Sequence, residues 1–318
     1  MNINLEKYPL DEEMLAYMEK CEAHYPANNG KLNLEDNRRL YLAMSQVFEA
    51  TIPAGITISD QQVAGRNGAI PTRTYNCSGN NSDVTIMYMH GGGFVVGNLD
   101  SHHSVCAEIA DKTGYRVVAV DYRLAPEHPH PAAFEDCLDV FLAIDQGSTI
   151  LCGDSAGATL TGSLCVAQQG TDRQPIAQVL IYPWLGGELH QLESYSTNFD
   201  APGLTVEDIE DYRKLRSAGM PSDNDPIYYP LALADFSGMP PCLAIAAEFD
   251  PLRDDAVDYV ERLEAARVEA TCHVEKGLVH GYLRARHSSS KAAESFSRIC
   301  QGLRAFGAKH PSQRCIGV

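Results

Sequence analysis

Short apolar runs alternate with helical patterns from about residue 83 onward, and this alternation determines the expected fold. The runs are too short for helices and most are rich in β-branched residues, so we predict buried strands at 84–89, 116–120, 149–152, 177–182, 242–247 and 270–275. Amphipathic stretches at 131–144 and 254–266 lie between them. This order predicts an α/β fold with a mostly parallel central sheet and helices on both faces.

The chain before residue 83 follows a different pattern. Residues 55–77 are typical of a hairpin, because Asn67-Gly68 is a strong turn signal, and its two strands would open the sheet as an antiparallel edge. Residues 11–50 contain two helical patterns. Their apolar faces consist of Met14, Leu15 and Met18 in the first helix and Leu40, Met44, Val47 and Phe48 in the second.

A further helical region, at about 188–220, fits the sheet pattern less well. Within it Thr205 and Asp208 have the spacing of a capping box. These helices and the N-terminal ones are either ordinary outer-layer helices or a cover over the sheet edge where open α/β folds bind ligands. The pattern alone leaves both possibilities open.

Composition excludes some classes of partner. Lys and Arg number 25 against 42 Asp and Glu, and the resulting charge of −17 repels nucleic acid and anionic membranes. The first 14 residues lack the basic and apolar regions of a signal peptide, so we expect a cytoplasmic protein. The ten cysteines are scattered without a CxxC pair, and we expect buried small hydrophobes, with neither disulfides nor a zinc site.

The string Gly153-x-Ser155-x-Gly157 supplies a candidate nucleophile. The string alone is weak evidence, but it stands between a predicted strand and a helical pattern, which is the setting that a nucleophile elbow requires. Ser155 is therefore the expected nucleophile. The N–H of Ala156, at the start of the helix, is a candidate oxyanion donor.

A run of three glycines after His90 supplies the second half of such a site. Gly91, Gly92 and Gly93 follow the strand at 84–89 directly, and they let the backbone approach a substrate with its N–H groups turned inward. A phosphate-binding loop would instead need a lysine followed by Ser or Thr, and none follows here.

An acid and a base are expected further along the chain, since this fold orders the triad as Ser, then Asp or Glu, then His. Asp250 and His280 each follow a predicted strand, at the edge where Ser155 also emerges. The imidazole would take the serine proton and the carboxylate would orient the imidazole. The alternatives are Glu248, Asp254, Asp255 and His273; two of these acids begin a helix, where capping explains them, and the histidine lies within a strand.

The motifs HGGGF, GDSAG, DPL and HG occur in this order between residues 84 and 283, with DYRLAPEHPHPAA and YPW between them. In this the chain resembles the hormone-sensitive-lipase-like family of α/β-hydrolases. The resemblance implies a triad of Ser155, Asp250 and His280 and an oxyanion hole formed by Gly92, Gly93 and Ala156. It also implies that residues 1–50 and an insertion at about 188–220 form a helical cap on a catalytic domain of residues 51–318.

The resemblance assigns supporting roles as well. Asp121, Arg123 and Glu127 would form one ion-pair and turn unit that braces the loop facing the site. His90 would hold the glycine loop by a hydrogen bond and take no part in catalysis.

We therefore expect a serine carboxylesterase that hydrolyses small esters with short acyl chains, without a metal or organic cofactor. Phe94 and Trp184 are the expected pocket residues, and the family suggests a homodimer. An amidase, a lactonase, a longer-chain lipase or a non-catalytic ligand-binding protein are alternatives on the same scaffold, and motifs do not separate them.

Overall fold

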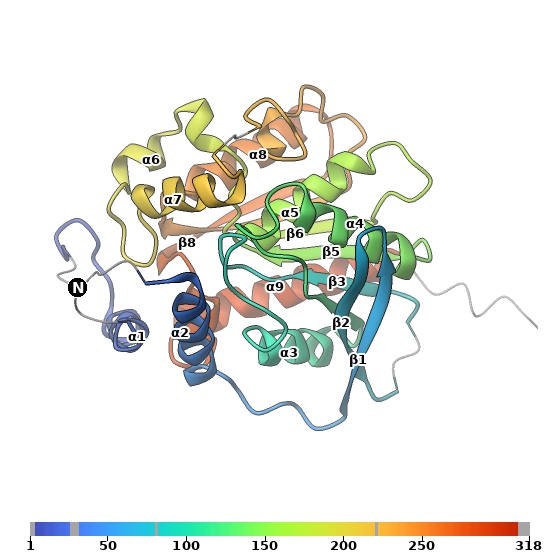
Figure 1. The fold of residues 1–318 in the computed structure, drawn as a ribbon, viewed down its shortest axis with the longest axis horizontal. Helices are drawn as coiled ribbons and strands as arrows, with labels where there is room; N and C mark the ends of the chain where they lie inside the picture. Colours follow the sequence, from blue (N-terminus) through green and yellow to red (C-terminus); the bar gives the residue numbers. More distant parts are fainter. Residues whose placement is uncertain (1–3, 26–31, 80–81, 220–221, 311–318) are drawn as a thin grey trace, which may run out of the picture.

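The structure is a computed structural model that describes residues 4–25, 32–79, 82–219 and 222–310 (Figure 1). An eight-stranded sheet forms its centre, in the order β1-β2-β4-β3-β5-β6-β7-β8. The strands are β1 (Ile56–Gly65), β2 (Gly68–Cys77), β3 (Thr85–Met89), β4 (Arg116–Val120), β5 (Thr149–Asp154), β6 (Ala177–Ile181), β7 (Cys242–Phe249) and β8 (Ala270–Val279). Every pairing among β3 to β8 is parallel, and β1 and β2 join antiparallel at one end. The predicted α/β architecture is confirmed.

Helices cover both faces of the sheet. On one face lie α3 (His103–Thr113) and α9 (Ser290–Ala308), and on the other α4 (Ala132–Ile144), α5 (Ala156–Ala167) and α8 (Arg253–Ala265) (Figure 1). Successive side chains of β3 point to opposite faces of the sheet and contribute to the apolar core on each face. Ile86 and Tyr88 pack with α3 and α9, and Met87 and Met89 pack with α4 and α5. The sequence pattern did not locate α3 and α9.

The hairpin turn lies one residue earlier than predicted. Gly65 pairs with Gly68, so Arg66 and Asn67 form the two-residue turn. Contacts with α4 hold this register, since the Arg66 N–H donates to Asp139 at 2.7 Å. Asn67 donates to Glu135 of the same helix at 2.8 Å.

The remaining helices come from the N-terminus and from the region after β6. They are α1 (Glu12–Glu22), α2 (Leu34–Val47), α6 (Glu193–Thr197) and α7 (Val206–Arg216), with short 3₁₀ turns at Gly187–His190, Pro230–Ala232 and Tyr282–His287. The capping box of Thr205 and Asp208 is present at the start of α7, as predicted. The prediction that Val47 belongs to the apolar face of the second helix is wrong. Val47 lies in the last turn of α2, and its side chain is 49% exposed.

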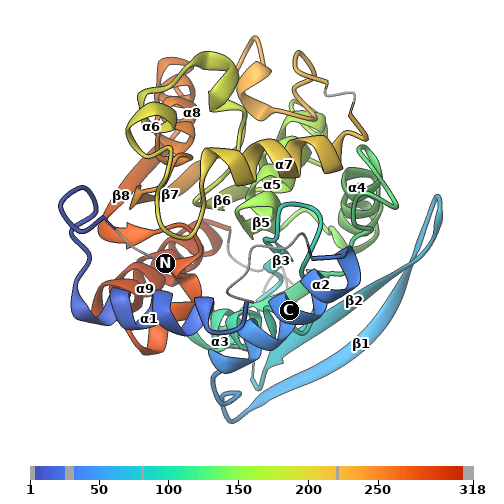
Figure 2. The ribbon, with the colours of Figure 1, turned by 60° about the vertical axis from the view of Figure 1, so that its left-hand side comes forward.

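The carboxyl ends of β3, β5, β7 and β8 meet at one edge of the sheet, since these strands are parallel. In Figure 2, α7 crosses above α1 and α2, and the ends of β3 and β5 lie between them. Side chains from these three helices line one cavity together with residues that follow the strands. None of the described helices combines the length and apolarity needed to cross a bilayer.

Candidate active site

Ser155 occupies a strained turn between β5 and α5. Its backbone has φ 53° and ψ −120°, an arrangement that few residues other than glycine adopt. The flanking glycines are required by packing: a Cβ on Gly157 would lie 2.0 Å from the carbonyl oxygen of Met89, and one on Gly153 2.4 Å from that of Gly157. The turn is thus pressed against β3, and the serine side chain stands half-buried at the edge of the sheet.

His280 and Asp250 lie beside the serine. The His280 Nε2 is 2.9 Å from the Ser155 Oγ, and its Nδ1 is 2.7 Å from a carboxylate oxygen of Asp250. Asp250 is fully buried, and its other oxygen accepts the N–H of Leu252 at 2.8 Å. The side-chain amide of Asn198 donates to the Asp250 carbonyl at 3.0 Å and holds this loop in place. The structure therefore brings the three expected side chains together in a hydrogen-bonded series.

The competing acids have other partners. Glu248 accepts the N–H of Gly277 at 2.7 Å, on neighbouring β8. The expectation that Asp254 and Asp255 cap a helix is wrong, since α8 begins without a side-chain cap. Asp254 instead accepts the Ser194 N–H, and Asp255 accepts two N–H groups of the loop after β6.

The glycine loop after β3 lies next to this series. Gly92 and Gly93 have φ of 130° and 60° and line the same cavity as Ser155. A Cβ on Gly92 would lie 2.2 Å from the carbonyl oxygen of Val96, so the loop has no room for a side chain there. No hydrogen bond between described residues uses the N–H of Gly92, Gly93 or Ala156 as donor, which leaves all three for a ligand.

Asp154, which sequence reasoning did not single out, connects the elbow with the glycine loop. Its carboxylate accepts the Tyr88 hydroxyl at 2.8 Å and the Gly91 N–H at 2.9 Å, and His102 Nε2 lies at 3.3 Å. Burial alone would raise the pKa of Asp154, but the charge and hydrogen bond of His102 hold this pKa well below its usual value. The side chain is therefore a buried anion. Its place inside GDSAG was visible in the sequence, but its partners were not.

His90 braces the glycine loop, as expected. Its Nδ1–H donates to the Gly91 carbonyl at 2.9 Å, and its ring stacks on Tyr122 with centroids 4.3 Å apart. The Tyr122 hydroxyl donates to the His90 carbonyl at 2.6 Å. Burial lowers the pKa of His90 to about 3, so the ring is neutral at physiological pH.

The expected unit of Asp121, Arg123 and Glu127 is wrong. Arg123 pairs with Asp136 of α4 at 2.9 Å. Glu127 pairs with Arg38 of α2 at 2.8 Å. No ion pair joins the three within the described residues, because Arg123 pairs with acids of α4 and Glu127 with an arginine of α2.

Ser155 and His280 of the hydrogen-bonded series line a cavity of about 400 Å³, and Asp250 is buried behind them. The cavity is bounded by Ser155, His280, Trp184 and side chains of α1, α2 and α7, among them Tyr17, Met18, Tyr41, Met44, Ile209 and Tyr212. Trp184 lines it as expected. Phe94 does not: its ring lies 6.1 Å from that of Trp184 and is covered by the Arg216 guanidinium at 4.0 Å. Phe94 thus supports the wall of the cavity from behind.

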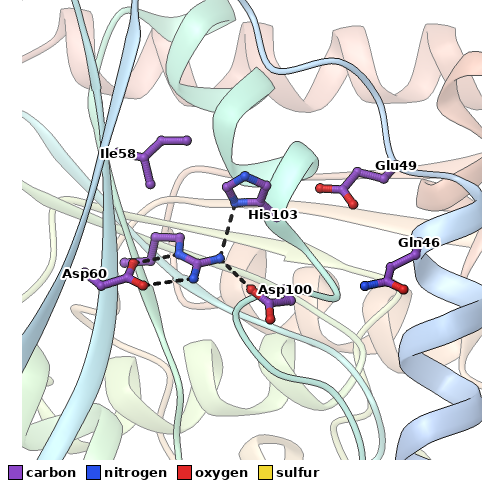
Figure 3. A pocket seen from close by; sticks show the side chains of 7 residues that line it. Gln46, Glu49, Ile58, Asp60, Asp100 and His103 are labelled. Carbon is purple, nitrogen blue, oxygen red and sulfur yellow. Dashed lines mark hydrogen bonds and ion pairs between the residues drawn. The ribbon is translucent and has the colours of Figure 1, made fainter.

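A second cavity, of about 580 Å³, lies between α2, β1, β2 and the start of α3 (Figure 3). It contains none of the expected site residues. Asp60 and Asp100 each bind Arg73 at 2.7 Å and neutralise its charge. Within the described residues, no group of His, Cys, Asp or Glu side chains has the arrangement needed to hold a metal ion.

Comparisons with known proteins agree with this geometry. Residues 86–284 match a family model described as alpha/beta hydrolase fold. The chain is 30% identical to the ethyl acetate hydrolase of Pseudomonas putida over 92% of this chain and 98% of that protein. It is 28% identical to the acetyl esterase of Salmonella typhi over 96% of each. A crystal structure of an esterase from the bacterial hormone-sensitive lipase family superposes with a TM-score of 0.81 at 30% identity, covering 93% of this chain and 98% of that one.

Proposed function

The chain belongs to the α/β-hydrolase fold family, in its hormone-sensitive-lipase-like branch, and from this premise we propose that it is a serine carboxylesterase for esters with short acyl chains. One observation carries the proposal: Asp250, His280 and Ser155 form a hydrogen-bonded series that opens into a cavity of about 400 Å³. Such a series on this fold is the machinery of acyl transfer.

In the proposed reaction the Ser155 Oγ attacks the ester carbonyl while His280 Nε2, at 2.9 Å, takes its proton. Asp250 holds the proton on Nδ1 and stabilises the imidazolium that forms. His280 then donates its proton to the leaving alcohol. A water deprotonated by the same ring attacks the acyl-serine and releases the acid.

The oxyanion of both tetrahedral intermediates would bind to the N–H groups of Gly92, Gly93 and Ala156. Two come from a loop that Asp154 and His90 brace, and the third from the N-terminus of α5, where the helix dipole favours negative charge. Each such donor contributes roughly 10²–10³ in rate. Because the donors are fixed before substrate binds, little reorganisation opposes the reaction.

Preference for short acyl chains has three supports. The cavity is near the low end of the range of about 300–1,000 Å³ common for small-molecule sites. Trp184 closes part of it with a bulky ring. The similarity to an ethyl acetate hydrolase and an acetyl esterase points the same way.

We also propose that the helices of residues 1–50 and about 188–220 act as a cap on the catalytic domain of residues 51–318. Side chains of α1, α2 and α7 contribute walls to the cavity, which supports this role. A cytoplasmic location fits the nine described cysteines, all of which are free thiols. The resemblance suggests a homodimer, which light scattering on the purified protein would measure.

Hydrolysis of p-nitrophenyl esters from acetate to laurate, with Ser155→Ala run in parallel, tests the proposal. We expect kcat/KM to fall steeply beyond butyrate or hexanoate, and the variant to be inactive. A maximum at ten or more carbons would move the chain to the lipases. A folded protein that cleaves no ester would overturn the esterase assignment, and assays with p-nitroanilides and lactones would then separate an amidase or lactonase from a binding protein.

A further inference from the structure

Arg284 is the one lysine or arginine among the described residues that line the active-site cavity. It lies in the 3₁₀ turn Tyr282–His287, which closely follows His280 in the chain. Its Nε donates to the Ser45 hydroxyl at 3.3 Å, and its Nη2 donates to the Tyr41 hydroxyl. Both partners belong to α2 and are neutral.

No carboxylate of the described residues forms an ion pair with the Arg284 guanidinium. Two acids line the same cavity. Asp208 accepts the Thr205 hydroxyl at the start of α7. Asp154 accepts Tyr88 and Gly91 and acts on Arg284 through its charge alone, without an ion pair. Within the described part of the chain, Arg284 forms no ion pair, and its Nη1 donates no hydrogen bond. An anion that enters the cavity would be stabilised by this half-buried guanidinium, because charge-assisted hydrogen bonds are stronger where water is excluded.

The surroundings of two other arginines differ from those of Arg284. Arg73, in the second cavity, is neutralised by Asp60 and Asp100 (Figure 3). Arg216 is 2% exposed and lies between the rings of Phe94 and Tyr228, at 4.0 and 3.8 Å, outside the active-site cavity. Among the described residues, Arg284 has no carboxylate partner and faces a single ring, that of Tyr41, whose centroid lies 4.9 Å away. It borders the space that the substrate would occupy.

Tyr41 extends the same polar surface. Its hydroxyl accepts from Arg284, and its own hydrogen is donated to no described residue, so it can serve a ligand. Asn37, one turn earlier on α2, also lines the cavity. Asn37 and Tyr41 therefore present polar groups from one face of α2 to the cavity.

We propose that Arg284, together with the Tyr41 hydroxyl, forms a subsite for a carboxylate group carried by the ester substrate. The inference rests on the proposed esterase function and specifies its substrate class: a monoester of a dicarboxylic acid, or an acyl ester of a hydroxycarboxylic acid. A guanidinium matches the two oxygens of a carboxylate. The net charge of −17 opposes an anion at long range, but salt screens that field beyond about 8 Å at physiological ionic strength.

Pairs of esters that are matched in length but differ in charge test this subsite and show which side of the ester carries the acid. Monoethyl succinate, glutarate and adipate are compared with ethyl pentanoate, hexanoate and heptanoate, and 4-acetoxybutanoate with pentyl acetate, by pH-stat. We expect at least one anionic ester to have a higher kcat/KM than its neutral partner. Arg284→Met should lower that ratio about ten- to hundredfold, and Arg284→Lys, which keeps the charge but not the guanidinium fork, should lower it less.

Arg73→Met is the matched control, because it changes the net charge equally in the other cavity and should leave the ratio unchanged. Calorimetric titration of the wild-type protein with glutarate gives a second readout that needs no turnover, and Arg284→Met should abolish that binding. If neutral esters are cleaved but Arg284→Met lowers both members of each pair alike, the arginine is structural and the subsite is refuted. If no ester is cleaved, the esterase proposal fails, and glutarate binding still decides whether the carboxylate subsite exists.

Discussion

The carboxylate of Asp154 accepts the backbone N–H of Gly91 at 2.9 Å, and this bond ties the nucleophile elbow to the glycine loop. Asp154 directly precedes Ser155, and Gly91 directly precedes the two proposed oxyanion donors of its loop. There is no space for a side chain between them, since a Cβ on Gly91 would lie 2.4 Å from the Asp154 carboxylate. One buried anion thus positions both the proposed nucleophile and the loop that carries two of the proposed oxyanion donors.

Asp154→Leu should therefore impair catalysis as well as folding. The substitution leaves the Gly91 N–H and the Tyr88 hydroxyl without their acceptor, at a cost of about 1–3 kcal/mol each in unfolding free energy. We expect kcat to fall about 10²-fold with a smaller change in KM, because the donors serve the transition state. Asp154→Asn keeps an acceptor oxygen and should lose less than tenfold. A Leu variant with wild-type kcat would show that the loop holds its shape without this bond.

Asp250 should be the acid that orients His280. Asp250→Asn removes the carboxylate at 2.7 Å from Nδ1 and favours the wrong imidazole tautomer, so we expect kcat to fall about 10³- to 10⁴-fold. Glu248→Gln is the matched control, since that carboxylate accepts from Gly277 and pairs with Lys276 on β8. It should retain kcat within a few fold. Equal losses in the two variants would argue against the assignment of Asp250.

Stability should decrease below about pH 6.5 through His90. Burial lowers the pKa of this ring from 6.5 to about 3, so the unfolded chain takes up a proton in this range and the folded protein does not. The contribution to stability is complete above pH 6.5 and declines as the pH falls toward 3. Each pH unit in that interval costs about 1.4 kcal/mol, or about 2 kcal/mol at pH 5 relative to pH 8.

His90→Asn tests this pH dependence, because an amide can still donate to the Gly91 carbonyl but does not titrate. Denaturant unfolding at pH 8 and pH 5 would measure both proteins. Between pH 8 and pH 5 the free energy of unfolding of the variant should fall by about 2 kcal/mol less than that of the wild type, whatever the stability of the variant at pH 8. The same loss in both proteins would assign the acid sensitivity to other groups.

The strands of the fold were predictable because each depends on a local pattern, whereas α3 and α9 were not located. Apolar runs identified the six strands β3 to β8, and their parallel order made the residues that follow β5, β7 and β8 neighbours in space. Ser155, Asp250 and His280 could be selected in this way without knowledge of a single contact. The hairpin turn was displaced by one residue because side-chain contacts with α4 fix its register.

The direction of polar side chains in loops was not predictable. Asp255 is a good example: its place at a helix start suggested a cap, yet it accepts the N–H groups of Leu185 and Gly187, about 70 residues away in sequence. Arg123 likewise pairs with Asp136 of α4, which the sequence did not suggest. Such partners are chosen by tertiary packing, and a single sequence carries no local signal for them.

Trp184 should limit the acyl chain, and its neighbour Phe94 allows this to be tested. Both rings are nearly buried, at 3% and 2% exposure, but only Trp184 borders the cavity. Trp184→Leu opens space beside Ser155, so the ratio of kcat/KM for octanoate to that for butyrate should rise about tenfold. Phe94→Leu removes a similar ring from behind the wall and should lower the unfolding free energy by about 1–3 kcal/mol while leaving the ratio unchanged. If both variants shift the ratio alike, the wall is deformable, and the packing of the residues behind it sets the chain length. A shift in neither variant would place the acyl chain against α1 and α2 instead.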